Sequence, residues 1–200
     1  MGNSIYLASQ SPRRRQLLEQ LGVRYELLLP DADEDAEALE AVVENETPAS
    51  YVKRVTALKL DAAVARLKRR KLPTAPVLCS DTTVAMGRSM FGKPENAKDA
   101  VRMLTELSGK THRVLTAVAV QSGRKRFDAL STSRVRFDVM TAAQIKAYVE
   151  TGEPMGKAGA YAIQGSVAQY IGHISGSYSG IMGLPLRETS LLLGGLGIKT

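Results

Sequence analysis

Short apolar runs alternate with amphipathic helical repeats along this chain, and this alternation limits the fold more than any other feature. Residues 5–8 form an apolar run, residues 12–21 carry leucines at helical spacing, and residues 25–29 form a second apolar run. Ser11 is a preferred N-cap residue, and Pro12 suits the first position of a helix. The chain therefore opens as a β-α-β unit.

The same alternation continues towards the C-terminus. We expect a helix at residues 48–71, a strand at 76–80, a hairpin turn at 86–90 and a helix at 96–107. Further on, we expect strands at 113–121 and 126–139, a helix at 141–150, a hairpin around 172–173 and a helix at 185–193. These elements predict a single α/β domain over residues 1–200, with a mixed sheet and a cleft.

Composition narrows the class of protein. The 200 residues are 44% hydrophobic and 24% charged, which is enough apolar content for a core and too little charge for global disorder. No apolar run approaches the roughly 18–20 residues that span a bilayer, and the first residues lack the pattern of a secretion signal. Cys79 is the only cysteine, so no intrachain disulfide can form. Because disulfides are typical of oxidising compartments, the single cysteine leads us to expect a cytoplasmic protein. His112 and His173 lack metal-binding spacing and are expected to be structural.

The net charge of +7 favours an anionic partner, such as a nucleotide, a nucleic acid or a membrane surface. Five basic residues close the long helix: Arg66, Lys68, Arg69, Arg70 and Lys71. They are typical either of a solvated helix end or of a nucleic-acid footprint. No aromatic residue is interleaved with them, which favours the solvated helix end and makes nucleic acid an unlikely partner.

The segment Ser9-Gln10-Ser11-Pro12-Arg13-Arg14 joins the first strand to the first helix. Free N–H groups at a helix N-terminus bind phosphate, and hydroxyl and guanidinium groups there reinforce this binding. The alternative is an ordinary capped helix with exposed arginines. Because the helix dipole disfavours cations in the first turn, an external anion would account for Arg13 and Arg14.

Two charged residues lie where charge is unusual. Lys59 falls inside the apolar stripe of the long helix, so it either extends to solvent or meets an anion. Asp81 follows the apolar run at residues 76–80, and ligand-binding groups commonly follow such buried strands in α/β sheets. Its carboxylate could bind a metal, orient water or form an Asx-turn.

Three further candidates carry weaker signals. Residues 31–46 contain eight carboxylates, so spacing does not single out Glu34, and this acidic loop is equally typical of a solvated charge run. Lys93 lies in the rigid turn Gly92-Lys93-Pro94. Gln164 could read the edge of a base through paired hydrogen bonds, or it could be a buried structural residue.

Taken in order, these segments resemble the Maf family of nucleoside triphosphate pyrophosphatases, from Leu7 to Leu192. The matching segments are residues 7–14, 33–34, 51–54 with Lys59, 81–82, 92–94, 107–112, 157–165, 176–178 and 183–186. Each segment alone is weak evidence for the family, but the whole set in this order is specific for it. Departures from the family's usual residues occur at Thr56, Leu60, Ser80 and Gly156.

The resemblance implies an elongated, twisted mixed sheet flanked by helices, with two lobes around a central cleft, as in inosine triphosphatase-like folds. It implies hydrolysis between the α- and β-phosphates of a nucleoside triphosphate, with Mg²⁺ or Mn²⁺ as cofactor. The segment Ile163-Gln164-Gly165 resembles the branch that acts on dTTP and UTP, whereas a sister branch acts on 7-methyl-GTP. The family also implies a homodimer, and a cellular role in cleaning the nucleotide pool or arresting cell division.

The resemblance also implies roles for individual residues. Asp81 and Lys93 are assigned to catalysis, with Asp81 as the proton acceptor, and Glu34 and Asp81 are assigned to the metal. The implied substrate-binding residues are Ser9, Ser11, Arg13, Arg14, Lys59, Thr82 and Gln164. The competing hypothesis is a non-catalytic nucleic-acid or regulatory binder, which rests on the net charge and the basic helix end.

Overall fold

A single mixed sheet lies at the centre of the computed structural model, which describes residues 4–32, 34–35 and 38–200. The strand order is β2-β1-β3-β5-β6-β7, and β4 pairs with β3. The strands are β1 (Ser4–Leu7), β2 (Arg24–Leu27), β3 (Val77–Met86), β4 (Ser89–Phe91), β5 (Thr111–Ser122), β6 (Lys125–Phe137) and β7 (Ile171–Ser175). β1 is parallel to β2 and β3, and the other pairs are antiparallel. The predicted mixed α/β fold is confirmed.

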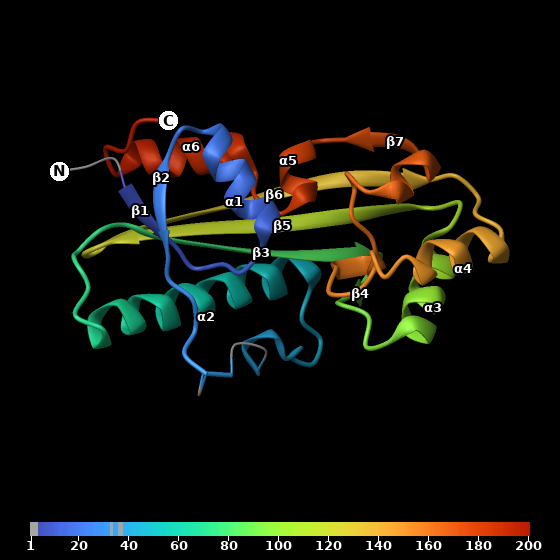
Figure 1. Ribbon diagram of the computed structural model, residues 1–200, viewed down its shortest axis with the longest axis horizontal. Helices are drawn as coiled ribbons and strands as arrows, with labels where there is room; N and C mark the ends of the chain where they lie inside the picture. The colour runs from blue at the N-terminus through green and yellow to red at the C-terminus, as the bar shows by residue number, and fades with distance from the viewer. Residues whose placement is uncertain (1–3, 33, 36–37) are drawn as a thin grey trace.

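Helices cover both faces of this elongated sheet (Figure 1). α2 packs against β3 and β5 on one face, α5 and α6 pack against β5 and β6 on the other, and α3 and α4 pack together towards one end. The helices are α1 (Pro12–Gln20), α2 (Pro48–Arg69), α3 (Ala97–Leu107), α4 (Ala142–Glu150), α5 (Tyr178–Met182) and α6 (Leu186–Gly195). Short 3-10 helices cover Ala38–Glu40, Ala158–Ala160 and Ser166–Tyr170. Among the described residues, none of the helices is both long and apolar enough to cross a membrane.

Four helices, α1 to α4, begin where the sequence predicts, and a polar side chain caps each of them. Ser11, Thr47, Asn96 and Thr141 each accept a hydrogen bond from the backbone N–H three residues later. Proline occupies the first turn of α1 and of α2. Each cap satisfies a donor that the helix cannot pair, which is typically worth about 1 kcal/mol.

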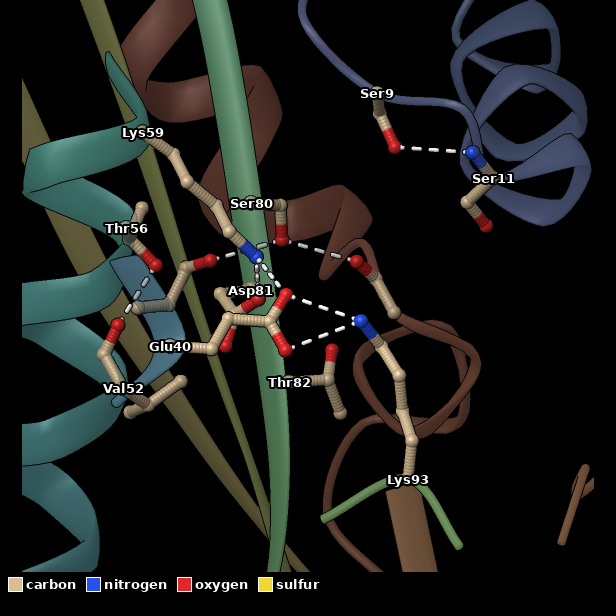
Figure 2. Close-up of polar contacts among 12 residues, drawn as sticks. Ser9, Ser11, Glu40, Val52, Thr56, Lys59, Ser80, Asp81, Thr82 and Lys93 are labelled. Atoms are coloured by element: carbon tan, nitrogen blue, oxygen red, sulfur yellow. Dashed lines mark hydrogen bonds and ion pairs between the residues drawn. The ribbon is translucent and has the colours of Figure 1, made fainter. Parts of the chain in front are cut away.

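The alternation of side chains along β3 separates two apolar layers and sets the direction of its polar residues. Cys79 packs with Leu60 on the α2 side of the sheet, whereas Leu78 packs with Leu17 on the α1 side. Because side chains alternate along a strand, Asp81 projects to the same side as Cys79. Residue 81 therefore faces α2, as Figure 2 shows.

The predicted end of the strand at Ser80 is wrong. β3 continues to Met86, so Asp81 lies inside it, opposite Ala117 of β5. The residues after Asp81 are Thr82, Thr83 and Val84, and β-branched side chains favour extended backbone. Asp81 still lies beyond the end of the parallel neighbour β1, whose last partner on β3 is Leu78.

The predicted hairpin at residues 172–173 is also wrong, because both residues lie within β7 and His173 pairs with Arg136 of β6. Gly172 has a different reason to be glycine: a Cβ there would lie 2.4 Å from an oxygen of Asp138. Glycine at this position therefore indicates that the backbone lies close to the Asp138 side chain, and not that the chain turns. The predicted hairpin between β3 and β4 is confirmed, with Met86 opposite Ser89.

Candidate active site

A cavity of about 980 Å³ lies between the two ends of the molecule. Its lining comes from the segment after β1, the acidic loop, α2, the middle of β3, the segment at residues 156–164 and the end of α5 with Gly183. It includes every site residue that the sequence predicts: Ser9, Ser11, Arg13, Arg14, Glu34, Lys59, Asp81, Thr82, Lys93 and Gln164. Asp33, which the resemblance pairs with Glu34, lies outside the described residues.

Lys59 and Asp81 form an ion pair on the α2 side of this cavity (Figure 2). Lys59 Nζ donates to Asp81 Oδ1 at 2.6 Å and to Glu40 Oε1 at 2.7 Å. Burial lowers the pKa of Lys59, but the two carboxylates outweigh burial and raise it overall. Of the two possibilities for a lysine in an apolar stripe, Lys59 meets an anion.

Glu40 connects this pair to Lys93. Lys93 Nζ donates to Glu40 Oε2 at 3.0 Å and to Oε1 at 3.1 Å, so one carboxylate bridges two ammonium groups (Figure 2). Burial raises the pKa of Glu40, but the adjacent ammonium groups of Lys59 and Lys93 lower it overall. The hydroxyl of Tyr51 holds the backbone by donating to the carbonyl oxygen of Glu40 at 3.0 Å. Sequence reasoning missed Glu40 because nothing in its spacing distinguishes it from its acidic neighbours.

Glu34 binds different cations from those of Asp81. Arg66 Nε donates to Glu34 Oε1 at 3.0 Å, a second nitrogen of Arg66 contacts Oε2, and Arg69 Nη2 contacts Oε1 at 2.5 Å. Hydrogen bonds from Arg66 are the main reason that the pKa of Glu34 falls to about 2. The structure therefore places Glu34 in the cavity wall without joining it to Asp81.

The basic end of α2 holds the acidic loop in place. Arg66 is buried and also donates to the carbonyl oxygen of Leu28 at 3.0 Å. Arg69 and Arg70 both contact Asp31. The predicted solvated helix end is wrong at Arg66, and the arginines that motivated the nucleic-acid hypothesis are bound to carboxylates of the chain itself.

The two arginines of the first helical turn differ in their surroundings. Arg14 Nε donates to the carbonyl oxygen of Gly183 at 2.8 Å, and its Nη2 donates to Thr82 Oγ1 at 3.4 Å. Arg14 therefore ties α1 to β3 and to the turn before α6. Arg13 lines the cavity, where burial lowers the pKa of its guanidinium. An external anion is not needed to explain Arg14.

Gln164 lies at another part of the cavity wall. Its side chain is exposed, which is inconsistent with a buried structural glutamine. The turn that carries it is closed by a hydrogen bond from Gly165 N to the carbonyl oxygen of Ala162 at 2.8 Å. The wall opposite α2 contains Thr82, whose hydroxyl lies 3.0 Å from that of Thr116.

A family comparison covers nearly the whole chain. Residues 4–196 match the family model described as Maf-like protein. The chain belongs to the Maf family. Proteins called dTTP/UTP pyrophosphatase are close in sequence: that of Polaromonas sp. is 71% identical over 98% of this chain and 96% of that protein. That of Albidiferax ferrireducens is 69% identical over the full length of both, and that of Cupriavidus pinatubonensis is 63% identical over 96% of each.

Among solved structures, this Maf-family chain has a distant likeness to the Ham1 protein of Staphylococcus aureus. The TM-score is 0.41 and the identity 12%, over 67% of this chain and 71% of that protein. A likeness at this level does not bear on function.

Carboxylates suitable for a metal are few in this Maf-family chain. Within residues 4–32, 34–35 and 38–200, no group of three or more His, Cys, Asp or Glu side chains could hold a metal ion. Asp81 and Glu40 contact the same ammonium group, so their carboxylates lie near each other in the cavity wall. Mg²⁺ in nucleotide enzymes is commonly held by one or two carboxylates together with substrate phosphates, and this pair fits that donor set.

His112 is a structural residue, as predicted. It is buried, and its Nε2 lies 2.8 Å from the hydroxyl of Tyr161, which is also buried. Burial lowers the pKa of His112 to about 4. The ring is therefore neutral at neutral pH and packs edge-on against Phe137.

Proposed function

We propose that the protein is a nucleoside triphosphate pyrophosphatase that hydrolyses dTTP and UTP to the monophosphate and pyrophosphate. Membership of the Maf family and the printed names of relatives up to 71% identical support this proposal. The observation that carries it is the cluster of Lys59, Lys93, Glu40 and Asp81 in one cavity. This cluster combines cations for a polyanion with a carboxylate placed for proton transfer.

The triphosphate binds where Glu40 now bridges the two lysines. A phosphate group carries the same kind of charge as the carboxylate and can accept from both ammonium groups. Arg13 and the N-terminus of α1 face the same cavity and add donors for further phosphate oxygens. As the bond between the α- and β-phosphates breaks, negative charge grows on the departing pyrophosphate, and Lys59, Lys93 and Arg13 stabilise it.

Asp81 accepts the proton of the attacking water. The carboxylate is 11% exposed, so it reaches the cavity while the strand holds its backbone on both sides. A phosphate oxygen that replaces Glu40 between the lysines gives Lys59 another anionic partner, so the Asp81 carboxylate need not stay fixed to the ammonium group.

A divalent cation is part of the proposal. Asp81 and Glu40 would hold it together with phosphate oxygens, and when bound it would neutralise charge on the triphosphate. Glu34, the position that the family resemblance assigns to the metal, is bound to Arg66 and Arg69. A cation at Glu34 would compete with two guanidinium groups, one of which is buried.

Gln164 reads the base. A primary amide offers one donor and one acceptor, which match the O4 acceptor and N3–H donor of thymine and uracil. The size of the cavity suits a nucleotide, since it falls at the upper end of the range of about 300–1,000 Å³ usual for small-molecule sites.

We also propose that the enzyme acts on free nucleotides in the cytoplasm. With Cys79 as the single cysteine, the chain has no intrachain disulfide, as is usual in a reducing compartment. The homodimer implied by the family resemblance stays a prediction, which the mass of the purified protein in solution will test.

A nucleotide panel tests the proposed activity. The purified protein is incubated with Mg²⁺ or Mn²⁺ and with dTTP, UTP, dCTP, GTP or 7-methyl-GTP, and the products are separated. We expect dTTP and UTP to be cleaved fastest, with monophosphate and pyrophosphate in equal amounts. Preferential cleavage of 7-methyl-GTP would place the chain in the other branch, and release of orthophosphate or no turnover would refute the proposal.

A further inference from the structure

Glu153 lies beneath the turn that carries Gln164, outside the cluster of charged residues around Asp81. It follows α4, and its side chain is partly buried. Its Oε2 accepts hydrogen bonds from the backbone N–H and from the hydroxyl of Ser166, both at 3.1 Å. Its Oε1 accepts from the hydroxyl of Tyr148 on α4 at 2.9 Å. One carboxylate thus joins α4 to the segment that immediately follows Gln164.

Gly165 shows how closely the turn packs on this carboxylate. A Cβ at Gly165 would lie 1.8 Å from Glu153 Oε1 and 2.4 Å from its carboxyl carbon. The φ of Gly165 is −90°, which any residue can adopt, so glycine is required by space and not by backbone conformation. The backbone of the turn therefore lies directly on the Glu153 side chain.

Hydrogen bonds hold the turn at Gly165 and directly after it. Gly165 N donates to the carbonyl oxygen of Ala162 and closes the turn around Gln164. After the turn, Glu153 accepts hydrogen bonds from the backbone N–H and the hydroxyl of Ser166. The side chain of Gln164 is exposed in the cavity wall, so its reach depends on where this backbone is held.

We propose that Glu153 is a positioning residue for base selection, which fixes the Gln164 turn through Ser166 and Gly165. The proposal rests on the proposed function, in which the Gln164 amide pairs with the base. A bidentate amide contact requires both hydrogen bonds to form in the plane of the base, and a displacement of about 1 Å breaks it. Phosphate binding and proton transfer use other parts of the cavity and depend less on this turn.

Glu153→Ala is the direct test. We measure kcat/KM for dTTP and dCTP, and equilibrium binding of both nucleotides in EDTA, for the wild type and the variant. We expect the preference for dTTP over dCTP to fall by about tenfold, the effect of losing one bidentate contact to a base. A purely structural role would lower both rates together and leave their ratio unchanged.

Matched variants distinguish a loss of positioning from a non-specific loss of structure. Glu153→Gln keeps an oxygen for Ser166 and can donate to the Tyr148 hydroxyl, so we expect it to keep most of the preference for dTTP. Glu150→Ala removes an exposed carboxylate at the end of the same helix and should change nothing. Gly165→Ala alone should lower the preference, and in the Glu153→Ala background it should have a smaller effect, because the clashing carboxylate is gone.

The outcomes distinguish this inference from the proposed function. A wild type that prefers dTTP, with a Glu153→Ala variant that keeps the wild-type ratio, overturns the positioning role alone. A wild type that neither binds nor cleaves any nucleotide selectively overturns both. Additive effects of Glu153→Ala and Gly165→Ala would also contradict the inference, since they would show that the two residues do not act through one contact.

Discussion

The carboxylate of Glu40 lies within 3.0 Å of Lys93 Nζ, and the same carboxylate binds Lys59 at 2.7 Å. Glu40 therefore occupies, within the chain itself, the position between two ammonium groups where a phosphate would bind. The backbone carbonyl of Glu40 is held by Tyr51, so we expect the side chain to rotate away from the lysines while the backbone stays in place.

Removing the charge of Glu40 should strengthen phosphate binding. We expect Glu40→Gln to bind inorganic tripolyphosphate about three- to tenfold more tightly in EDTA, because partly exposed ion pairs contribute up to about 1 kcal/mol each and no longer compete. Isothermal titration calorimetry measures this directly. Glu46→Gln is the control, since Glu46 pairs with Arg54 instead. Equal or weaker binding by Glu40→Gln would show that Glu40 does not occupy the phosphate position.

Removing the charge of Glu34 should lower stability rather than catalysis. Arg66 is buried, and losing one member of a buried ion pair costs roughly 3–5 kcal/mol; we expect about 2 kcal/mol because Glu34 is 21% exposed. Denaturant unfolding of Glu34→Gln measures this loss. Glu44→Gln, an exposed carboxylate of the same segment, should unfold like the wild type.

The stabilisation by Glu34 should also depend on pH. The folded pKa of about 2 lies below the usual 4.5, so the carboxylate stabilises the fold above pH 4.5. That contribution is lost as the pH falls towards 2. The stability difference between the wild type and Glu34→Gln should therefore shrink over this range, and a constant difference would contradict the assigned ion pair.

His112 predicts a second pH dependence. Its folded pKa of about 4 lies below the usual 6.5, so below pH 6.5 the unfolded chain binds a proton that the folded chain does not. Stability should fall by up to about 3 kcal/mol as the pH drops from 6.5 to 4. Urea unfolding of His112→Gln should lack this component. His173→Gln, at an exposed position on β7, is the control and should retain the loss of stability at low pH. If the stability of the wild type and of His112→Gln changed with pH in parallel, His112 would not be its source.

Local rules predicted much of the fold. The caps at Ser11, Thr47, Asn96 and Thr141 are short-range signals, and each marks the helix that the structure contains. The end of β3 depends instead on its long pairing with β5, which a local pattern does not record. The same is true of β7, where glycine at 172 indicates contact with Asp138 and not a turn.

The candidate site, too, was predictable from local sequence signals only in part. Lys59 was informative because charge is unusual inside an apolar stripe, and Asp81 because it directly follows an apolar run. Glu40 lies in a loop rich in carboxylates, and only the three-dimensional arrangement shows which of them reaches the lysines. Glu34 and Arg66 come from distant parts of the sequence, so their pairing could not be read from spacing.

The central claim is that Asp81 accepts the proton during hydrolysis, and the Asp81→Asn variant tests it most directly. Lys59 keeps Glu40 as a partner in this variant, so we expect the melting temperature, and the dTTP affinity measured in EDTA, to remain near those of the wild type. The measurement is kcat for dTTP, with Asp128→Asn on β6 as the control. We predict a loss of about 10²- to 10⁴-fold for Asp81→Asn, the usual contribution of a general base. A folded Asp81→Asn variant that hydrolyses dTTP at the wild-type rate would contradict the account.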